Sequence, residues 1–207
     1  MKKSCLIVDY GMGNLRSVEK ALNHLGVSVQ ISGDPKDVIN ADKIILPGVG
    51  NFAAAVTKLK SKGLWDVLNK KVQLDQTPIL GICLGMQLMA KHSEEGNETG
   101  FGWIDASVKR FAPKDSLKYK IPHVGWNSAI AKGQSTLLKG ITDTDLFYFV
   151  HSYYMACSLE EDAAARTHYD FEFDSVVSKH HVFGVQFHPE KSYEAGSKIL
   201  KNFIEYS

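Results

Sequence analysis

Short, mainly apolar segments alternate with longer periodic segments throughout the first half of the chain. The apolar segments cover residues 4–9, 27–31, 43–46 and 78–82. In the longer segments, apolar residues recur every three or four positions as in an amphipathic helix; these cover residues 14–25, 52–60 and 64–74. Apolar strands that alternate with helices are typical of a parallel sheet buried on both faces. We therefore predict an α/β fold in which helices cover a mostly parallel central sheet.

The second half of the chain has a different pattern. Residues 101–187 are rich in aromatic and β-branched residues and in turn signals, which predicts an added region of antiparallel or mixed strands. Further helices are expected at residues 84–90 and 192–204. The 207 residues contain no internal repeat, low-complexity segment or linker-like stretch. This length and uniformity predict a single domain over residues 1–207.

Charge and hydropathy argue against two classes of function. Lys and Arg total 24 while Asp and Glu total 23, so the net charge of +1 supplies no field that would attract a polyanion. No apolar run approaches the ~18 residues that are needed to cross a bilayer. We therefore expect neither a nucleic-acid partner nor a membrane-spanning segment.

Cysteine usage indicates a reducing compartment. The three cysteines, Cys5, Cys83 and Cys157, are widely spread and form no CxxC pair. This arrangement is unlike a disulfide framework or a structural zinc site. The basic residues 1–3 could open a signal peptide, but Asp9 interrupts the apolar stretch that follows them. We therefore predict a cytoplasmic protein without a bound metal.

The sequence Gly81-Ile82-Cys83-Leu84-Gly85 follows an apolar strand and precedes a helix-competent segment. It has the spacing of a nucleophile elbow, with cysteine in place of serine. Flanking glycines relieve crowding in such a turn, and the start of a helix favours a thiolate. The backbone N–H of Leu84 would also point to the place where an oxyanion forms. Cys83 is therefore a candidate nucleophile, and a small buried core residue is the alternative.

A histidine followed by a carboxylate ends the last predicted strand. His188 comes directly after Phe187, and Pro189 then stops the strand before Glu190. Glu190 can fold back onto the imidazole and hold its working tautomer, as the acid of a catalytic triad does. A cysteine hydrolase needs a thiolate, a histidine that moves protons and such an acid. Alone, this pair would more often be a surface turn; together with Cys83 it predicts a catalytic triad.

Two glycine-rich segments allow a competing interpretation. Pro47-Gly48-Val49-Gly50 ends a strand and has little side-chain bulk, so its N–H groups could approach a ligand closely. The stretch 48–53 formally fits the GxGxxG/A fingerprint of dinucleotide-binding proteins. Gly11-Met12-Gly13 also follows the first strand, with Asp34 about 20 residues on, but Arg16 takes the place of the third glycine. A nucleotide-binding α/β module is therefore a second hypothesis, which thermal stabilisation by NAD would test.

Six segments together make the chain resemble the class I, triad-type glutamine amidotransferases, and among them the glutaminase subunits of imidazole glycerol phosphate synthase. They are Asp9–Asn14, Pro47–Phe52, Gly81–Leu88, Pro122–Asn127, Phe149–Tyr153 and Phe187–Ser192. The elbow and His188-Pro189-Glu190 are typical of triad-type amidotransferases in general. The segments 47–50 and 122–127 resemble this subunit family in particular. The resemblance covers nearly the whole chain and implies a flavodoxin-like, three-layer α/β/α class I glutamine amidotransferase fold.

The resemblance also implies an activity and a set of roles. Cys83 would attack L-glutamine and form a γ-glutamyl thioester, His188 would move the protons, and Glu190 would orient His188. Glutamate and ammonia are the implied products, and no cofactor is implied. The oxyanion would be held by backbone N–H groups of Leu84 and of the loop at Val49 and Gly50. The residues expected to hold the substrate are Gly50, Gln87, Glu95, Ser152 and Tyr153.

The same resemblance implies a partner, because ammonia becomes unreactive ammonium in water. It would pass to a separate (β/α)8-barrel cyclase subunit that makes imidazole glycerol phosphate in histidine biosynthesis. The residues expected at that interface are Asn14, Trp126, Tyr148 and Lys191. Relatives of these subunits feed ammonia to another synthase in surface-sugar amidination. The resemblance therefore leaves two alternatives for the ammonia acceptor, the cyclase or this other synthase.

Two further alternatives have less support. Stress- or deglycase-type proteins on a similar scaffold usually carry histidine directly after the cysteine, where this chain has Leu84. A zinc site built from Cys83, His180, His181 and His188 lacks any recognised ligand spacing.

Overall fold

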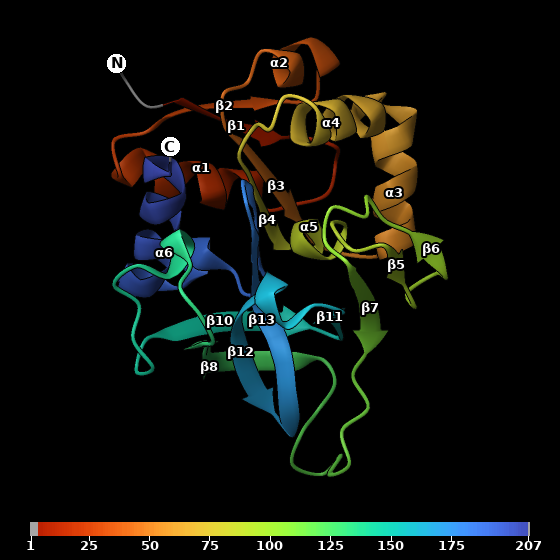
Figure 1. Ribbon diagram of the computed structural model, residues 1–207, viewed down its shortest axis with the longest axis vertical. Helices are drawn as coiled ribbons and strands as arrows, with labels where there is room; N and C mark the ends of the chain where they lie inside the picture. The colour runs from red at the N-terminus through yellow and green to blue at the C-terminus, as the bar shows by residue number, and fades with distance from the viewer. Residues whose placement is uncertain (1–3, 207) are drawn as a thin grey trace.

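Helices pack on both faces of a central sheet in the computed structural model, which describes residues 4–206 (Figure 1). The basic residues 1–3 that bear on the signal-peptide question lie outside the described residues. The sheet begins with strands that pair in parallel, in the order β2-β1-β3-β4-β14. These strands are β1 (Ser4–Val8), β2 (Ser28–Ser32), β3 (Ile44–Gly48), β4 (Ile79–Cys83) and β14 (Val182–Val185). The predicted α/β fold with a mostly parallel central sheet is confirmed.

Two groups of helices form the outer layers. One face is covered by α1 (Leu15–His24) and α6 (Tyr193–Glu205). The opposite face is covered by α2 (Pro35–Ile39), α3 (Phe52–Ser61) and α4 (Leu64–Gln73). Successive residues of β1 alternate between the two cores, because the side chains of a strand point to opposite faces. Both faces of the inner strands are therefore buried, which explains why β3, β4 and β14 are buried at every position, whereas the edge strand β2 carries polar and exposed residues. Within residues 4–206, no helix is long and apolar enough to span a membrane.

Antiparallel strands extend the sheet beyond β14. The longer ones are β7 (Ala106–Arg110), β11 (Tyr153–Cys157), β12 (Ala163–Tyr169) and β13 (Phe171–Lys179). Short strands lie at its margins: β5 (His92–Ser93), β6 (Glu98–Thr99) and β9 (Ile130–Ala131). Three 3-10 turns lie in this half of the chain: η1 (Thr136–Leu138) between β9 and β10, η2 (Glu160–Asp162) between β11 and β12, and η3 (Pro189–Lys191) between β14 and α6. The predicted antiparallel region is thus present.

A separate two-stranded ribbon lies beside this extension (Figure 1). It consists of β8 (His123–Ser128) and β10 (Leu146–His151), paired antiparallel so that Trp126 lies opposite Tyr148. Phe147 and Phe149 point into the core, so the alternate residues of β10 face away from it.

The helix predicted at residues 84–90 is shorter than expected. Helix α5 spans Leu84–Gln87 only, because the backbone carbonyls that follow it bond to the loop 101–104. The Phe101 N–H donates to Leu88 at 2.8 Å, and the Gly102 N–H donates to Ala90 at 3.0 Å. Helix α2 was not predicted, although Asp34 caps it and Pro35 occupies its first position.

Candidate active site

Cys83 stands at a strained turn between β4 and α5. Its backbone angles are φ 55° and ψ −110°, a conformation that non-glycine residues rarely adopt. The flanking glycines make this turn possible. A Cβ atom on Gly85 would collide with the Leu46 carbonyl oxygen, and one on Gly81 would lie 2.6 Å from the Gly85 backbone. The expected elbow geometry therefore depends on close packing between β3, β4 and α5.

The Cys83 side chain lines a cleft of about 380 Å³ at the carboxyl ends of β3 and β4. The thiol residue is only 7% exposed. All residues predicted to form the oxyanion hole or to hold the substrate line the same cleft: Val49, Gly50, Leu84, Gln87, Glu95, Ser152 and Tyr153. Pro122, Val150 and His151 complete its wall. The structure thus gathers groups that are far apart in the sequence around one sulfur atom.

His188 follows β14, the strand directly beside β4. Val185 of β14 pairs with Ile82 of β4, so the two chain segments leave the sheet together. Nδ1 of His188 lies 2.8 Å from Oε1 of Glu190, and both side chains are almost fully buried. The His188 backbone is fixed as well, because its N–H donates to the Tyr148 carbonyl at 2.9 Å. The imidazole is therefore held between a carboxylate and the ribbon strand β10.

The pKa of His188 reflects a competition between burial and two neighbours. Burial lowers it, but interactions with Cys83 and Glu190 outweigh burial and raise the pKa of His188 to about 9. Within residues 4–206, Nε2 of His188 makes no well-formed hydrogen bond, so Cys83 acts on the ring by proximity. Hydrogen bonds between catalytic groups often tighten only when substrate binds. At neutral pH the ring is an imidazolium beside the sulfur.

Gln186, which is not among the residues predicted for the site, also contacts the sulfur. Its Nε2 atom lies 3.7 Å from Cys83 Sγ, and the residue is fully buried. A signal for it exists in the sequence, because Gln186 is the one amide within the apolar stretch 182–187. A buried amide must find partners, and those partners are not visible from the sequence.

Residues 6–206 match the family model described as glutamine amidotransferase class-I. The chain belongs to that family. The amidotransferase is 47% identical over 199 residues to imidazole glycerol phosphate synthase subunit HisH 2 of Methanococcus maripaludis, covering 96% of this chain and 98% of the relative. It is 42% identical to subunit HisH 2 of Pseudomonas aeruginosa, covering 97% and 98%. At such identity over nearly the whole length, it is a member of the same subunit family.

Solved structures with lower sequence identity share the fold. The PurLQS structure from Thermotoga maritima superposes with a TM-score of 0.75 at 19% identity, covering 100% of this chain and 99% of that one. The glutaminase domain of Trypanosoma brucei CTPS, solved with bound acivicin, gives 0.65 at 18% identity, covering 100% and 95%. The predicted class I glutamine amidotransferase fold is confirmed.

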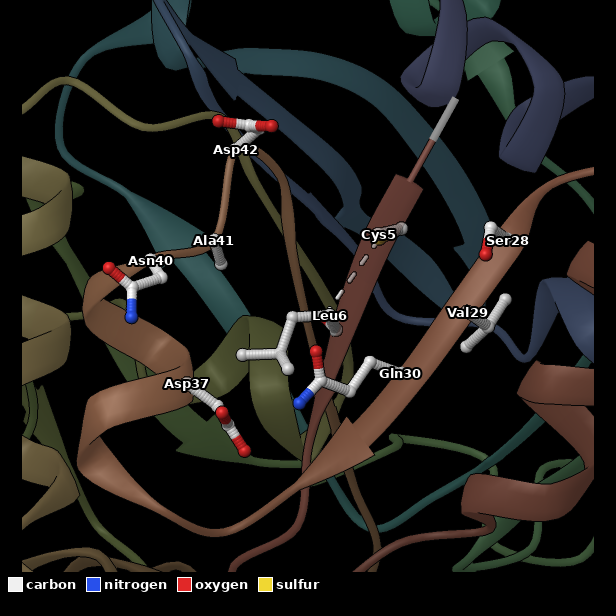
Figure 2. A pocket seen from close by; sticks show the side chains of 9 residues that line it. All are labelled: Cys5, Leu6, Ser28, Val29, Gln30, Asp37, Asn40, Ala41 and Asp42. Carbon is white, nitrogen blue, oxygen red and sulfur yellow. Dashed lines mark hydrogen bonds between the residues drawn. The ribbon is translucent and has the colours of Figure 1, made fainter. Parts of the chain in front are cut away.

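Cys5, the first of the two remaining cysteines, lies at the opposite end of the sheet. It lines a smaller cavity of about 190 Å³ at the amino ends of β1 and β2 (Figure 2). Its Sγ lies 3.9 Å from the Leu6 carbonyl oxygen, and burial raises the pKa of its thiol to about 12. Cys5 is therefore a neutral core thiol at physiological pH.

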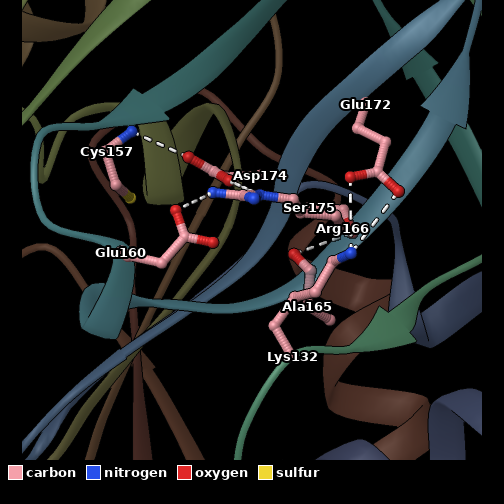
Figure 3. Close-up of polar contacts among 8 residues, drawn as sticks. All are labelled: Lys132, Cys157, Glu160, Ala165, Arg166, Glu172, Asp174 and Ser175. Carbon is pink, nitrogen blue, oxygen red and sulfur yellow. Dashed lines mark hydrogen bonds and ion pairs between the residues drawn. The ribbon is translucent and has the colours of Figure 1, made fainter.

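Cys157 lies beside a polar cluster of the antiparallel region (Figure 3). Its backbone N–H donates to Asp174, which also accepts from Arg166 at 2.8 Å; Arg166 in turn pairs with Glu160 at 2.6 Å. Burial, and then the negative charge of Asp174, raise the pKa of the Cys157 thiol. Cys83 is thus the cysteine of the amidotransferase that faces the cleft.

The four residues weighed as a zinc site do not come together. His181 Nε2 lies 2.8 Å from the Val72 carbonyl oxygen, at the amino end of β14, while Cys83 and His188 lie at the carboxyl ends of β4 and β14. Within the described part of the chain, no group of three or more His, Cys, Asp and Glu side chains could hold a metal ion.

Three of the predicted interface residues form one aromatic cluster outside the cleft. Trp126 contacts Tyr148 edge-on at 5.9 Å, and the Lys191 ammonium lies 5.5 Å from the Tyr148 ring. Tyr193 joins this cluster, because its ring stacks on Trp126 at 5.3 Å although it is 80% exposed. Asn14, the fourth predicted residue, occupies the N-cap position of α1 without a side-chain capping hydrogen bond, and α1 packs against η3.

Proposed function

We propose that this amidotransferase is the glutaminase subunit of an imidazole glycerol phosphate synthase in histidine biosynthesis. It would hydrolyse L-glutamine to glutamate and ammonia and pass the ammonia to a separate subunit. The observation that carries this proposal is the strained turn that presents Cys83 in a cleft beside His188, whose Nδ1 lies 2.8 Å from Glu190. The names of the HisH relatives support the same assignment.

In the first step, the Cys83 sulfur attacks the side-chain amide carbon of glutamine. The C–N bond then breaks, and His188 gives its proton to the departing ammonia, leaving a γ-glutamyl thioester. The tetrahedral oxyanion would be stabilised by the N–H groups of Leu84 and of the Val49-Gly50 loop, which lie at the same cleft. Losing one such donor typically costs ~2.7–4 kcal/mol of barrier. A small change in this loop would therefore strongly change the rate.

In the second step, His188 takes a proton from water, and the resulting hydroxide attacks the thioester carbon. Glutamate leaves with a new carboxyl oxygen, and the thiolate of Cys83 is restored as the partner of the imidazolium. Glu190 keeps Nδ1 of His188 protonated throughout, so Nε2 is the atom that faces the reaction. The step consumes one water: one of its protons stays on His188, and the other is released from the new carboxyl group as glutamate leaves.

The polar groups of the cleft fit the free α-amino and carboxylate groups of the substrate. Glu95 would attract the ammonium, and its carboxylate is fixed because Oε2 accepts from the Phe52 N–H at 2.8 Å. Gln87 donates both of its amide hydrogens inside the protein, which leaves its Oε1 as an acceptor for the same ammonium. The Ser152-Tyr153 backbone would hold the carboxylate.

The outer face of the β8–β10 ribbon is the surface proposed for a (β/α)8-barrel cyclase subunit. Its side chains are large, apolar and unusually exposed: Val124 is 54%, Trp126 44% and Leu146 50% exposed. Apolar patches of this kind mark protein interfaces. Tyr148 belongs to this ribbon, and its carbonyl accepts a hydrogen bond from the His188 N–H. A partner that docks on the ribbon would therefore influence the position of the His188 imidazole.

Two further expectations accompany this proposal. The family match over residues 6–206 supports one domain across the chain of 207 residues. Cys5, Cys83 and Cys157 are all free, which supports a reducing, cytoplasmic location.

A different acceptor is the second candidate function. Methanococcus maripaludis has two proteins named as this subunit, and this chain is 47% identical to subunit HisH 2 and 42% identical to subunit HisH 1. An organism with two such glutaminases can supply two synthases with ammonia. The same chemistry would then serve another amidation, such as that of a surface sugar.

A glutaminase assay with each candidate synthase subunit tests both proposals. We expect slow hydrolysis by the isolated chain, a large increase with its own partner, and no activity for Cys83→Ala. Activation by the cyclase alone identifies the histidine pathway, whereas activation only by the other synthase identifies the second candidate. Full activity of Cys83→Ala would refute the nucleophile, and fast turnover without any partner would refute the ammonia-relay role.

A further inference from the structure

We propose that Gln186 is a positioning residue that holds the Cys83 sulfur by a hydrogen bond from its side-chain amide. The proposal rests on the proposed function only in taking Cys83 as the nucleophile. Nε2 of Gln186 lies 3.7 Å from Cys83 Sγ, within range for a hydrogen bond to sulfur, and Gln186 is fully buried. Gln186 therefore contacts the Cys83 sulfur although it lies outside the predicted triad.

The direction of the Gln186 amide is fixed by a backbone carbonyl. The Tyr153 carbonyl can only accept, so the Gln87 atom 2.9 Å from it must be the nitrogen. The same nitrogen lies 3.0 Å from the Gln186 side chain, which must therefore present its oxygen to Gln87. The Gln186 NH2 group is then the end that points to Cys83. The side-chain amides of Gln87 and Gln186 therefore each have one permitted orientation.

Two buried histidines hold the other end of this network. Nδ1 of His151 lies 2.8 Å from the same Tyr153 carbonyl and must donate to it. Nε2 of His151 is then an acceptor, and it lies 3.1 Å from Nδ1 of His123 in the ribbon strand β8. Burial lowers the pKa of His151 to about 3 and that of His123 to about 4, so both rings are neutral. A continuous series of hydrogen bonds thus runs from the ribbon to the sulfur.

An amide donor suits a thiolate that must both persist and react. It stabilises negative charge on sulfur, yet it has no proton to transfer and does not compete with His188 for the departing ammonia. The titratable groups around the sulfur are His188, with Glu190 behind it, and Tyr10, whose buried hydroxyl interacts electrostatically with Cys83. Glu95, His151 and Tyr153 line the same cleft. None of these groups changes when Gln186 is replaced, so a change in sulfur reactivity would report the amide.

The test is the pH dependence of Cys83 alkylation by iodoacetamide, followed by peptide mapping. In the full chain carrying Gln186→Met, which preserves length but removes the amide, we expect the midpoint to rise by about one pH unit. We also expect kcat for glutamine to fall about tenfold with little change in KM, because Gln186 does not line the cleft. Gln87→Met removes the group that orients Gln186 and should raise the alkylation midpoint less.

A matched control is Thr167→Val, which removes a buried hydrogen bond to the Ser128 carbonyl at 2.8 Å, away from the cleft. Its alkylation profile should equal that of the wild type. An unchanged midpoint in a folded Gln186→Met variant overturns the proposal. If the wild type showed no Cys83-dependent glutaminase activity but Gln186→Met still shifted the alkylation midpoint, only the proposed function would be contradicted.

A measurement on the unaltered side chain covers the case in which Gln186→Met does not fold. In protein labelled with ¹⁵N-glutamine, the Gln186 amide resonances should titrate with the alkylation midpoint of Cys83. They should lose that titration in Cys83→Ala. Resonances that ignore both pH and the Cys83→Ala substitution would overturn the proposal.

Discussion

Nδ1 of His188 lies 2.8 Å from Oε1 of Glu190, and the two side chains are 2% and 1% exposed. This distance is that of a charge-assisted hydrogen bond between two ionisable side chains that are shielded from solvent. The carboxylate therefore fixes the ring and stabilises its protonated form. The contribution of the pair to catalysis can be tested by a substitution that removes the charge of Glu190 and keeps the shape of its side chain.

Glu190→Gln should lower kcat for glutamine hydrolysis by about 10²- to 10⁴-fold, because the ring loses its orientation and its counter-charge. The pKa of His188, about 9 in the intact protein, should fall because burial then outweighs the remaining interaction with Cys83. NMR titration of the His188 ring nitrogens measures this change. A variant with the original midpoint and near-normal kcat would remove Glu190 from the triad.

Stability should decrease on the acid side of neutrality because of His123 and His151. Both are held neutral in the folded protein, with the pKa lowered to about 4 and about 3, whereas in the unfolded chain each titrates near 6.5. Their stabilising effect is therefore present above pH 6.5 and is lost as the pH falls from 6.5 toward 4. We expect urea denaturation to give a loss of more than about 2 kcal/mol between pH 7 and 4.5. His123→Phe should reduce this loss, whereas exposed His24→Gln should not.

A glutamine analogue with a diazo-ketone group should label one cysteine stoichiometrically. The expected site is Cys83, because Cys5 and Cys157 are protonated thiols away from the cleft. Peptide mapping after labelling measures the site. Cys5→Ala and Cys157→Ala should label normally, and an adduct on either of those residues in the wild type would contradict the assignment.

Gly85→Ala should destabilise the fold by about 3 kcal/mol or more, because the new methyl group collides with the Leu46 carbonyl. The urea midpoint measures this loss. Gly133→Ala is the matched control, since a Cβ atom there meets nothing within 4 Å and stability should change by less than about 0.5 kcal/mol. Equal stability of the two variants would show that β3 and α5 are not closely packed.

Trp126→Ala should weaken binding of the cyclase subunit by about 2 kcal/mol, or about 30-fold in Kd. The reason is loss of an exposed ring that also supports Tyr193 by stacking. Isothermal titration calorimetry with the cyclase measures the effect. Leu74→Ala, at a more exposed apolar residue at the end of α4, should bind normally. Unchanged affinity for Trp126→Ala would place the partner on another surface.

The sequence was most informative where local chemistry alone sets the structure. The apolar strands were predictable because burial on both faces requires apolar residues throughout, as β1 illustrates. The turn at Cys83 was predictable because only glycine fits at 81 and 85. The end of α5 was not, because it depends on bonds from the loop 101–104, which lies close only after folding.

The missed parts of the site depend on contacts over long sequence distances. Gln186 forms hydrogen bonds with Gln87, 99 residues away in the sequence, and with Cys83, 103 residues away. No local sequence pattern predicts which residues it contacts. Tyr193 was missed for a related reason. Its ring belongs to the start of α6, and its role as a neighbour of Trp126 appears only when that helix packs near the ribbon.

The pairing of β14 with β4 also constrains when activity can arise during synthesis. A growing polypeptide carries the Cys83 thiol for about a hundred further residues before His188 leaves the ribosome. Until β14 pairs with β4, the nascent chain lacks the His188 imidazole that the proposed hydrolysis of glutamine requires beside Cys83. Hydrolytic capacity would therefore appear in a single event, when β14 pairs with β4 and brings His188 beside Cys83.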